Sequence, residues 1–107
     1  MNNNTIELLR LIQENPNLPI VPMVDNEIVG DGDGRWVGSF GSCRVDEYTF
    51  DEYYGDGCIM FKGDDDDILI QGIAEYKYNG TKEDYKRAEE ELKTMWIKAI
   101  IVNIDLP

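Results

Sequence analysis

The chain has 107 residues, a formal net charge of −12 and 42% hydrophobic residues. That length predicts one domain, residues 1–107, and the hydrophobic content excludes a disordered acidic tail. The negative charge disfavours direct binding to nucleic acid or to anionic membranes, and it favours basic partners.

The location of the protein is predicted from what its sequence lacks. No stretch approaches the roughly 20 apolar residues of a membrane span, and the first residues have no basic start of a signal peptide. We therefore expect a cytoplasmic protein, monomeric or homodimeric. Cys43 and Cys58 are expected to be reduced residues of strands, because both alternate with apolar neighbours. A bridge between them stays an alternative that requires adjacent strands in the right register.

The N-terminal part predicts a helix and a short strand. Apolar residues at helical spacing predict a helix over 5–14, and Asn15-Pro16 ends it because a residue before proline avoids the α region. Residues 20–24 predict a strand that Pro22 confines to the edge of a sheet.

A glycine-rich stretch with short strands follows. Residues 25–34 predict turns and the start of a return strand. Strands are then expected over 35–40 and 42–50, with a bulge or a tight hairpin at Gly38 and Gly41 between them.

The next stretch is polar and acidic. A turn over 51–57 leads to a short strand over 58–62. Asp64–Asp67 then favours a helix start, because carboxylates complement the free N–H groups there. Residues 66–78 fit either a helix or a strand. If they form a helix, one face carries Leu69, Ile73 and Tyr76.

The C-terminal part predicts a helix and a buried strand. Asn79-Gly80 is a stop signal, and Thr81 with Asp84 forms a capping box for a helix that reaches about Met95. The nearly continuous apolar residues over 97–104 predict a central strand with helices against it. The fold class is therefore α+β, with about five mostly antiparallel strands and two to three helices packed on the sheet.

The sequence lacks the residue patterns of common catalytic and metal sites. It has no histidine, and two cysteines alone do not make a structural zinc site. Asp31 and Asp33 begin like a calcium loop, but Phe40 stands where that loop needs a bidentate Glu. We therefore expect no catalytic residues, no metal and no cofactor.

Residues 25–67 contain thirteen Asp or Glu and three Lys or Arg, so this segment contributes −10 of the net charge. Aromatic residues alternate with the carboxylates, and this mixture is typical of surfaces that bind Arg- or Lys-rich partners. Simple solvation of the surface explains the charge equally well. The residues predicted to bind a partner are Asp46, Glu47, Asp51, Glu52, Tyr53, Tyr54, Asp56, Asp64, Asp65, Asp66 and Asp67.

Three blocks of sequence carry a family resemblance. They are residues 8–24, which read LLRLIQENPNLPIVPMV, the stretch GRWVGS at 34–39, and KAIIVNIDLP at 98–107. The chain resembles small uncharacterised proteins encoded by phages and prophages of Gram-positive bacteria. The resemblance covers roughly half of the chain and implies a setting inside a host bacterium. Small acidic proteins of that setting are often anti-CRISPR or anti-restriction inhibitors. By analogy, we expect such a role for this chain.

These observations lead to one main expectation and two alternatives. The main one is a non-enzymatic inhibitor that mimics nucleic acid and binds a basic groove on a host defence protein, such as an RNA-guided nuclease. One alternative is a structural or regulatory interaction module that works through the apolar segment 16–24 and the predicted hairpin. The other is a small-molecule binder that uses Arg35, Trp36 and nearby carboxylates.

Overall fold

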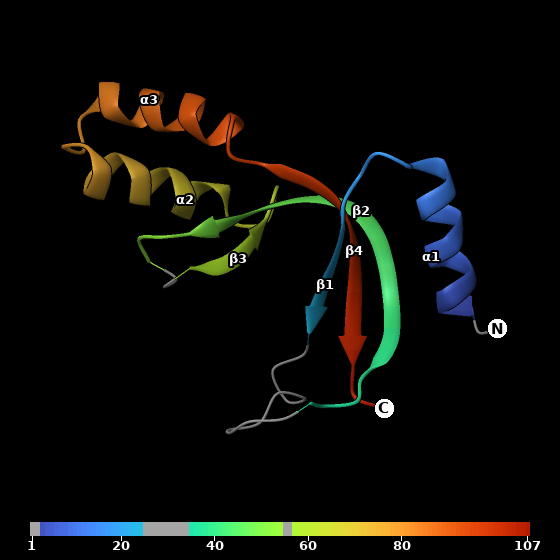
Figure 1. Ribbon diagram of the computed structural model, residues 1–107. Helices are drawn as coiled ribbons and strands as arrows, with labels where there is room; N and C mark the ends of the chain where they lie inside the picture. The colour runs from blue at the N-terminus through green and yellow to red at the C-terminus, as the bar shows by residue number, and fades with distance from the viewer. Residues whose placement is uncertain (1–2, 25–34, 55–56) are drawn as a thin grey trace. The chain divides into compact units, whose positions relative to one another are not determined.

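The computed structural model describes residues 3–24, 35–54 and 57–107 (Figure 1). The chain forms two compact units, a first unit of Met1–Asp46 with Lys98–Pro107 and a second unit of Glu47–Ile97. The elements are α1 (Asn3–Glu14), β1 (Ile20–Val24), β2 (Ser39–Asp51), β3 (Cys58–Phe61), α2 (Asp66–Gly72), the π-helical turn η1 (Ile73–Lys77), α3 (Lys82–Lys93) and β4 (Ile97–Asp105). The protein is therefore α+β, and its strands follow the order β1-β4-β2-β3.

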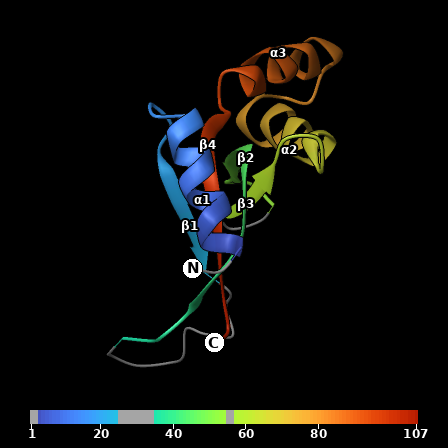
Figure 2. The same cartoon turned by 90° about the vertical axis from the view of Figure 1, so that its right-hand side faces the viewer.

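In the first unit, α1 packs on a central strand. β1 pairs with β4 in parallel, from Ile20 opposite Ile100 to Val24 opposite Ile104. Leu11 of α1 forms a buried cluster with Ile100 and Val102 of β4. Figure 2 looks onto α1, which lies in front of β1 and β4. The predicted helix, edge strand and central strand are confirmed in this unit.

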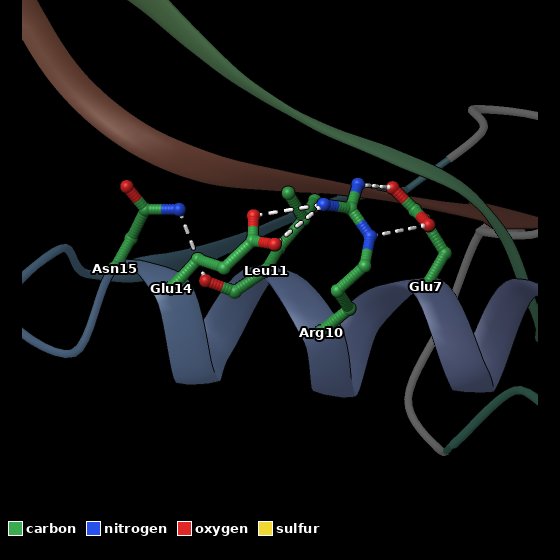
Figure 3. A network of polar contacts seen from close by, with 5 residues as sticks. All are labelled: Glu7, Arg10, Leu11, Glu14 and Asn15. Carbon is green, nitrogen blue, oxygen red and sulfur yellow. Dashed lines mark hydrogen bonds and ion pairs between the residues drawn. The ribbon is translucent and has the colours of Figure 1, made fainter.

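Partly exposed charged side chains run along α1 beside Leu11. The Arg10 guanidinium binds Glu7 and donates from Nη1 to both carboxylate oxygens of Glu14 at 2.8 Å (Figure 3). The hydrogen bond from Arg10 lowers the pKa of Glu7. At the end of the helix, the Asn15 side chain donates to the Leu11 carbonyl at 3.1 Å. The predicted stop at Asn15-Pro16 is thereby confirmed.

The second unit joins a β-hairpin to a pair of helices. β2 and β3 pair antiparallel, from Tyr48 opposite Phe61 to Asp51 opposite Cys58. α2 and α3 lie side by side (Figures 1 and 2). The core of the unit is a buried cluster of Leu69, Ile73, Ala74, Ala88 and Leu92. The capping box of Thr81 and Asp84 is present at the start of α3, as predicted.

The segment 66–78 is helical and contains a π-helical turn. The Tyr78 N–H donates to the Ile73 carbonyl at 3.3 Å, five residues back instead of four. This wider turn brings Tyr78 against the buried cluster. It leaves Tyr76 63% exposed. The prediction that Tyr76 shares the buried face of Leu69 and Ile73 is therefore wrong.

The predicted strands over 35–40 and 42–50 are not separated by a hairpin. Residues 39–51 form the single strand β2, and residues 35–38 are not in a strand. Gly41 serves close packing instead of a turn, because a Cβ atom there would lie 2.0 Å from Asp105 Oδ2. The described residues form four strands, and the β1–β4 pair is parallel. The prediction of about five mostly antiparallel strands is corrected accordingly.

Other predictions have mixed outcomes. The strand predicted over 58–62 is β3, and Cys43 and Cys58 are both free. The turns and the return strand predicted over 25–34 lie outside the described residues. The single domain over 1–107 stays a prediction.

Candidate protein-binding surface

The carboxylates at the middle of β2 are engaged within the protein. Arg44 Nε donates to Asp46 Oδ2 at 2.8 Å, and Lys62 Nζ lies 3.3 Å from Glu47 Oε2. Asp46 and Glu47 are both among the residues predicted to bind a partner. Because neighbouring cations offset their charge, they attract a basic partner less than a solvated carboxylate would.

Asp51 does not belong to a contact surface. Its side chain is only 1% exposed at the end of β2. Its Oδ1 atom accepts hydrogen bonds from the backbone N–H groups of Tyr53 and Tyr54, both at 3.1 Å. Aspartate often holds a turn in this way, by satisfying N–H groups two and three residues further on. The prediction that Asp51 binds a partner is wrong, because the turn after β2 buries its carboxylate.

Asp64–Asp67, here called the acidic run, lies at the start of α2. Asp64, Asp65 and Asp67 are exposed. Asp66 is half-buried and accepts a hydrogen bond from the Gly63 N–H at 2.8 Å. Residues 63–68 line an open hollow of about 370 Å³. Within the described chain, no lysine or arginine forms an ion pair with the acidic run.

Tyr53 and Tyr54 meet a third tyrosine, which the sequence did not suggest as a binding residue. The Tyr76 ring stacks on Tyr53 with centroids 6.2 Å apart and planes 12° apart. It meets the Tyr54 ring edge-on, with centroids 5.2 Å apart and planes 84° apart. We call Tyr53, Tyr54, Tyr76 and the adjacent Glu75 the tyrosine cluster. It joins the turn after β2 to η1.

Close approach of the turn to α2 depends on Gly72. A Cβ atom there would lie 3.0 Å from the Tyr53 Cβ atom and 3.4 Å from the Tyr54 ring. A side chain at this position would therefore displace Tyr53, whereas the distance to Tyr54 is an ordinary van der Waals contact. Gly72 thus allows Tyr53 to lie close to the helix that carries Tyr76.

Glu75 connects the rings through hydrogen bonds. It accepts from the Tyr85 hydroxyl at 2.7 Å and from the Tyr54 hydroxyl at 3.2 Å. Gln71 Nε2 donates to it at 3.3 Å. These bonds, led by that of Tyr85, lower the pKa of Glu75, so its carboxylate stays ionised. Burial, followed by the bond to Glu75, raises the pKa of Tyr54 to about 12.

The other predicted contact residues are spread over the second unit. Glu52 is exposed and lines a hollow of about 270 Å³ with Tyr53, Lys77 and Glu91. Asp56 lies outside the described residues. The acidic run and the tyrosine cluster stand near opposite ends of the α2–η1 helix. Asp66 and Tyr76 are ten residues apart, or about 15 Å along a helix.

The described residues offer little support for other kinds of site. They contain no group of three or more Cys, Asp or Glu side chains placed to hold a metal ion. None of the described helices has the length and apolar character that a membrane crossing requires. Comparison with family models, curated proteins and solved structures found no match to this chain.

Proposed function

We propose that this chain is a non-enzymatic inhibitor that binds a basic, nucleic-acid-binding groove of a host defence protein, with the acidic run of the second unit as its contact surface. The supporting observation is the acidic run, whose exposed carboxylates form no ion pair within the described chain. A cationic groove provides the counter-charges that the protein itself does not.

The charge of the second unit supports this assignment. Residues 47–97 contain fourteen Asp or Glu and six Lys or Arg, a net charge of −8. The four carboxylates of the acidic run are consecutive in the sequence and therefore concentrate negative charge in one place, as the phosphates of a nucleic-acid strand do.

The proposed setting is a bacterium infected by a phage, as the resemblance of residues 8–24, 34–39 and 98–107 implies. In that setting, an RNA-guided nuclease is the proposed target. Its nucleic-acid channel is positively charged and binds the backbone by charge, so an acidic protein competes for the same residues.

The proposal is tested by neutralising two matched sets of three carboxylates. Asp64, Asp65 and Asp67 are changed to Asn, while Asp66 is kept because it binds the Gly63 N–H. Glu83, Glu89 and Glu90 on α3 are changed to Gln as the control, because they too are exposed. Both variants lose three negative charges.

The measurement is DNA cleavage by a guide-loaded RNA-guided nuclease with increasing amounts of each variant. At roughly 0.5 kcal/mol for each exposed charge pair, the aspartate variant loses about tenfold in affinity. The glutamate variant stays within about twofold of the unmodified protein, and inhibition by the unmodified protein weakens with salt. Equal losses in the two variants, or no inhibition by the unmodified protein, would contradict the proposal.

Exposed apolar residues favour one second candidate, an interaction module that acts through the first unit. Val37 is 79% exposed and Phe40 is 53% exposed, and Trp36 beside them is also exposed. Changing Val37 and Phe40 to Ser would then abolish partner binding. Under this candidate, neutralising the acidic run would leave partner binding intact.

A further inference from the structure

The tyrosine cluster has the geometry of a site for one cationic side chain. Tyr76 is 63% exposed although it belongs to the helical segment that carries the unit's core. The stacked Tyr53 supports its ring, and the perpendicular Tyr54 ring stands at its side. The three rings therefore form one aromatic group, and the 63% exposure of Tyr76 makes its ring accessible from solvent.

The cluster also carries a charge that attracts cations. Glu75 is exposed, and in the described chain no lysine or arginine forms an ion pair with it. Hydroxyl and amide groups hold its carboxylate in place without neutralising it. A cation over Tyr76 would meet both an aromatic face and a fixed negative charge.

A neighbouring tyrosine shows that this unit already binds cations on aromatic rings. The Arg87 guanidinium lies 4.8 Å from the centroid of the Tyr78 ring, and Lys77 Nζ lies 5.6 Å from it. Both distances are within the roughly 6 Å of a cation–π interaction. Of the described lysines and arginines, none is placed in this way over Tyr76.

We propose that the tyrosine cluster binds an arginine side chain of the basic partner, which stacks on Tyr76 beside the Glu75 carboxylate. This inference rests on the proposed function, because it assumes a basic partner. Arginine fits better than lysine, because a planar guanidinium stacks on a ring and donates to a carboxylate in one plane. The acidic run supplies general attraction, whereas the cluster selects the chemical type of the cation.

The test compares two peptide probes, hexa-arginine and hexa-lysine, by isothermal titration calorimetry at the same salt concentration. The unmodified protein is expected to bind hexa-arginine about threefold more tightly than hexa-lysine, because a guanidinium stacks on Tyr76 and donates to Glu75 at the same time, whereas an ammonium is a point charge. Tyr76→Leu is expected to remove this preference. Tyr76→Phe is expected to keep it, because the aromatic face remains.

Phe50→Leu is the matched control, since it removes an exposed ring of β2 that lies outside the tyrosine cluster. It is expected to keep the preference for arginine. Equal affinity of the two peptides for the unmodified protein would overturn the inference, and so would a preference that survives in Tyr76→Leu. Far-UV circular dichroism verifies that each variant is folded.

A failure of the inference is distinguishable from a failure of the proposed function. The variant with Asp64, Asp65 and Asp67 changed to Asn is expected to bind both peptides more weakly. If that loss occurs while Tyr76→Leu has no effect on the preference, only the arginine site is overturned. If neutralising the acidic run changes neither peptide binding nor nuclease inhibition, the proposed function fails as well.

Discussion

Replacing Asp51 with Ala is expected to destabilise the protein strongly. If Asp51 were an exposed contact residue, as the sequence predicted, the same change would have little effect on stability. The change removes the acceptor of two backbone hydrogen bonds, from the N–H groups of Tyr53 and Tyr54. Leaving a buried donor unsatisfied costs about 1–3 kcal/mol. Because both N–H groups are partly buried, we expect a loss of about 3 kcal/mol in the free energy of unfolding.

Replacing Asp51 with Asn provides the matched comparison. The amide oxygen keeps both acceptor bonds, and the amide nitrogen takes the place of Oδ2, a buried oxygen without a hydrogen-bond partner, so one unpartnered polar atom replaces another. We therefore expect Asp51→Asn to stay within about 1 kcal/mol of the unmodified protein.

The assay is urea unfolding at 25 °C, monitored by circular dichroism and tryptophan fluorescence. The dependence of the free energy of unfolding on urea concentration is compared between variants. An Asp51→Ala variant as stable as the unmodified protein would refute the structural role of Asp51. Equal destabilisation in the Ala and Asn variants would show that the charge, and not the acceptor geometry, matters.

Three other predictions address the helix cap, the core of the first unit and the tyrosine cluster. Thr81→Ala removes the cap of α3 and is expected to cost about 1 kcal/mol in urea unfolding, while Thr81→Ser keeps the hydroxyl and costs less. Leu11→Ala leaves a cavity against Ile100 and is expected to cost about 2–4 kcal/mol, measured in the same way. Tyr54 has a pKa raised from 10.0 to about 12 in the folded protein, so its contribution to stability is present below pH 10 and is lost as pH rises towards 12. The difference in tyrosinate absorbance between the unmodified protein and Tyr54→Phe isolates this titration from those of the other tyrosines. Glu75→Gln is expected to lower the pKa of Tyr54, and an unchanged titration would contradict the role of Glu75.

Local signals in the sequence identified most elements of the fold. Proline after Asn15 ended α1, and the pair Thr81 and Asp84 marked the start of α3, because a cap acts within one turn of chain. The prediction of a hairpin at Gly41 was wrong for a different reason. A glycine serves a turn and a close contact equally well, and the contact with Asp105 involves a residue 64 positions away in the sequence.

The candidate site was less predictable than the fold. Composition identified Tyr53 and Tyr54 as candidates, but not whether each carboxylate beside them is exposed, as the buried Asp51 illustrates. Tyr76 was missed because the π-helical turn moves it out of the regular helical pattern. The one local signal is the pair Glu75-Tyr76, which combines an acid and an aromatic residue outside the predicted acidic segment.

The two compact units change which acidic residues belong together. Residues 25–67 are one acidic segment in sequence, but the boundary after Asp46 divides them between the two units. The second unit combines the acidic run with Glu75 and the carboxylates of α3, which the segment does not include.

A basic partner that contacts only the segment would lose binding when residues on both sides of Asp46 are changed. A partner that contacts the second unit is sensitive to Glu75 and to the acidic run, and insensitive to acidic residues of the first unit such as Asp46. Comparing partner binding by Glu75→Gln and Asp46→Asn therefore decides between the two surfaces, because Glu75 belongs only to the second unit and Asp46 only to the segment.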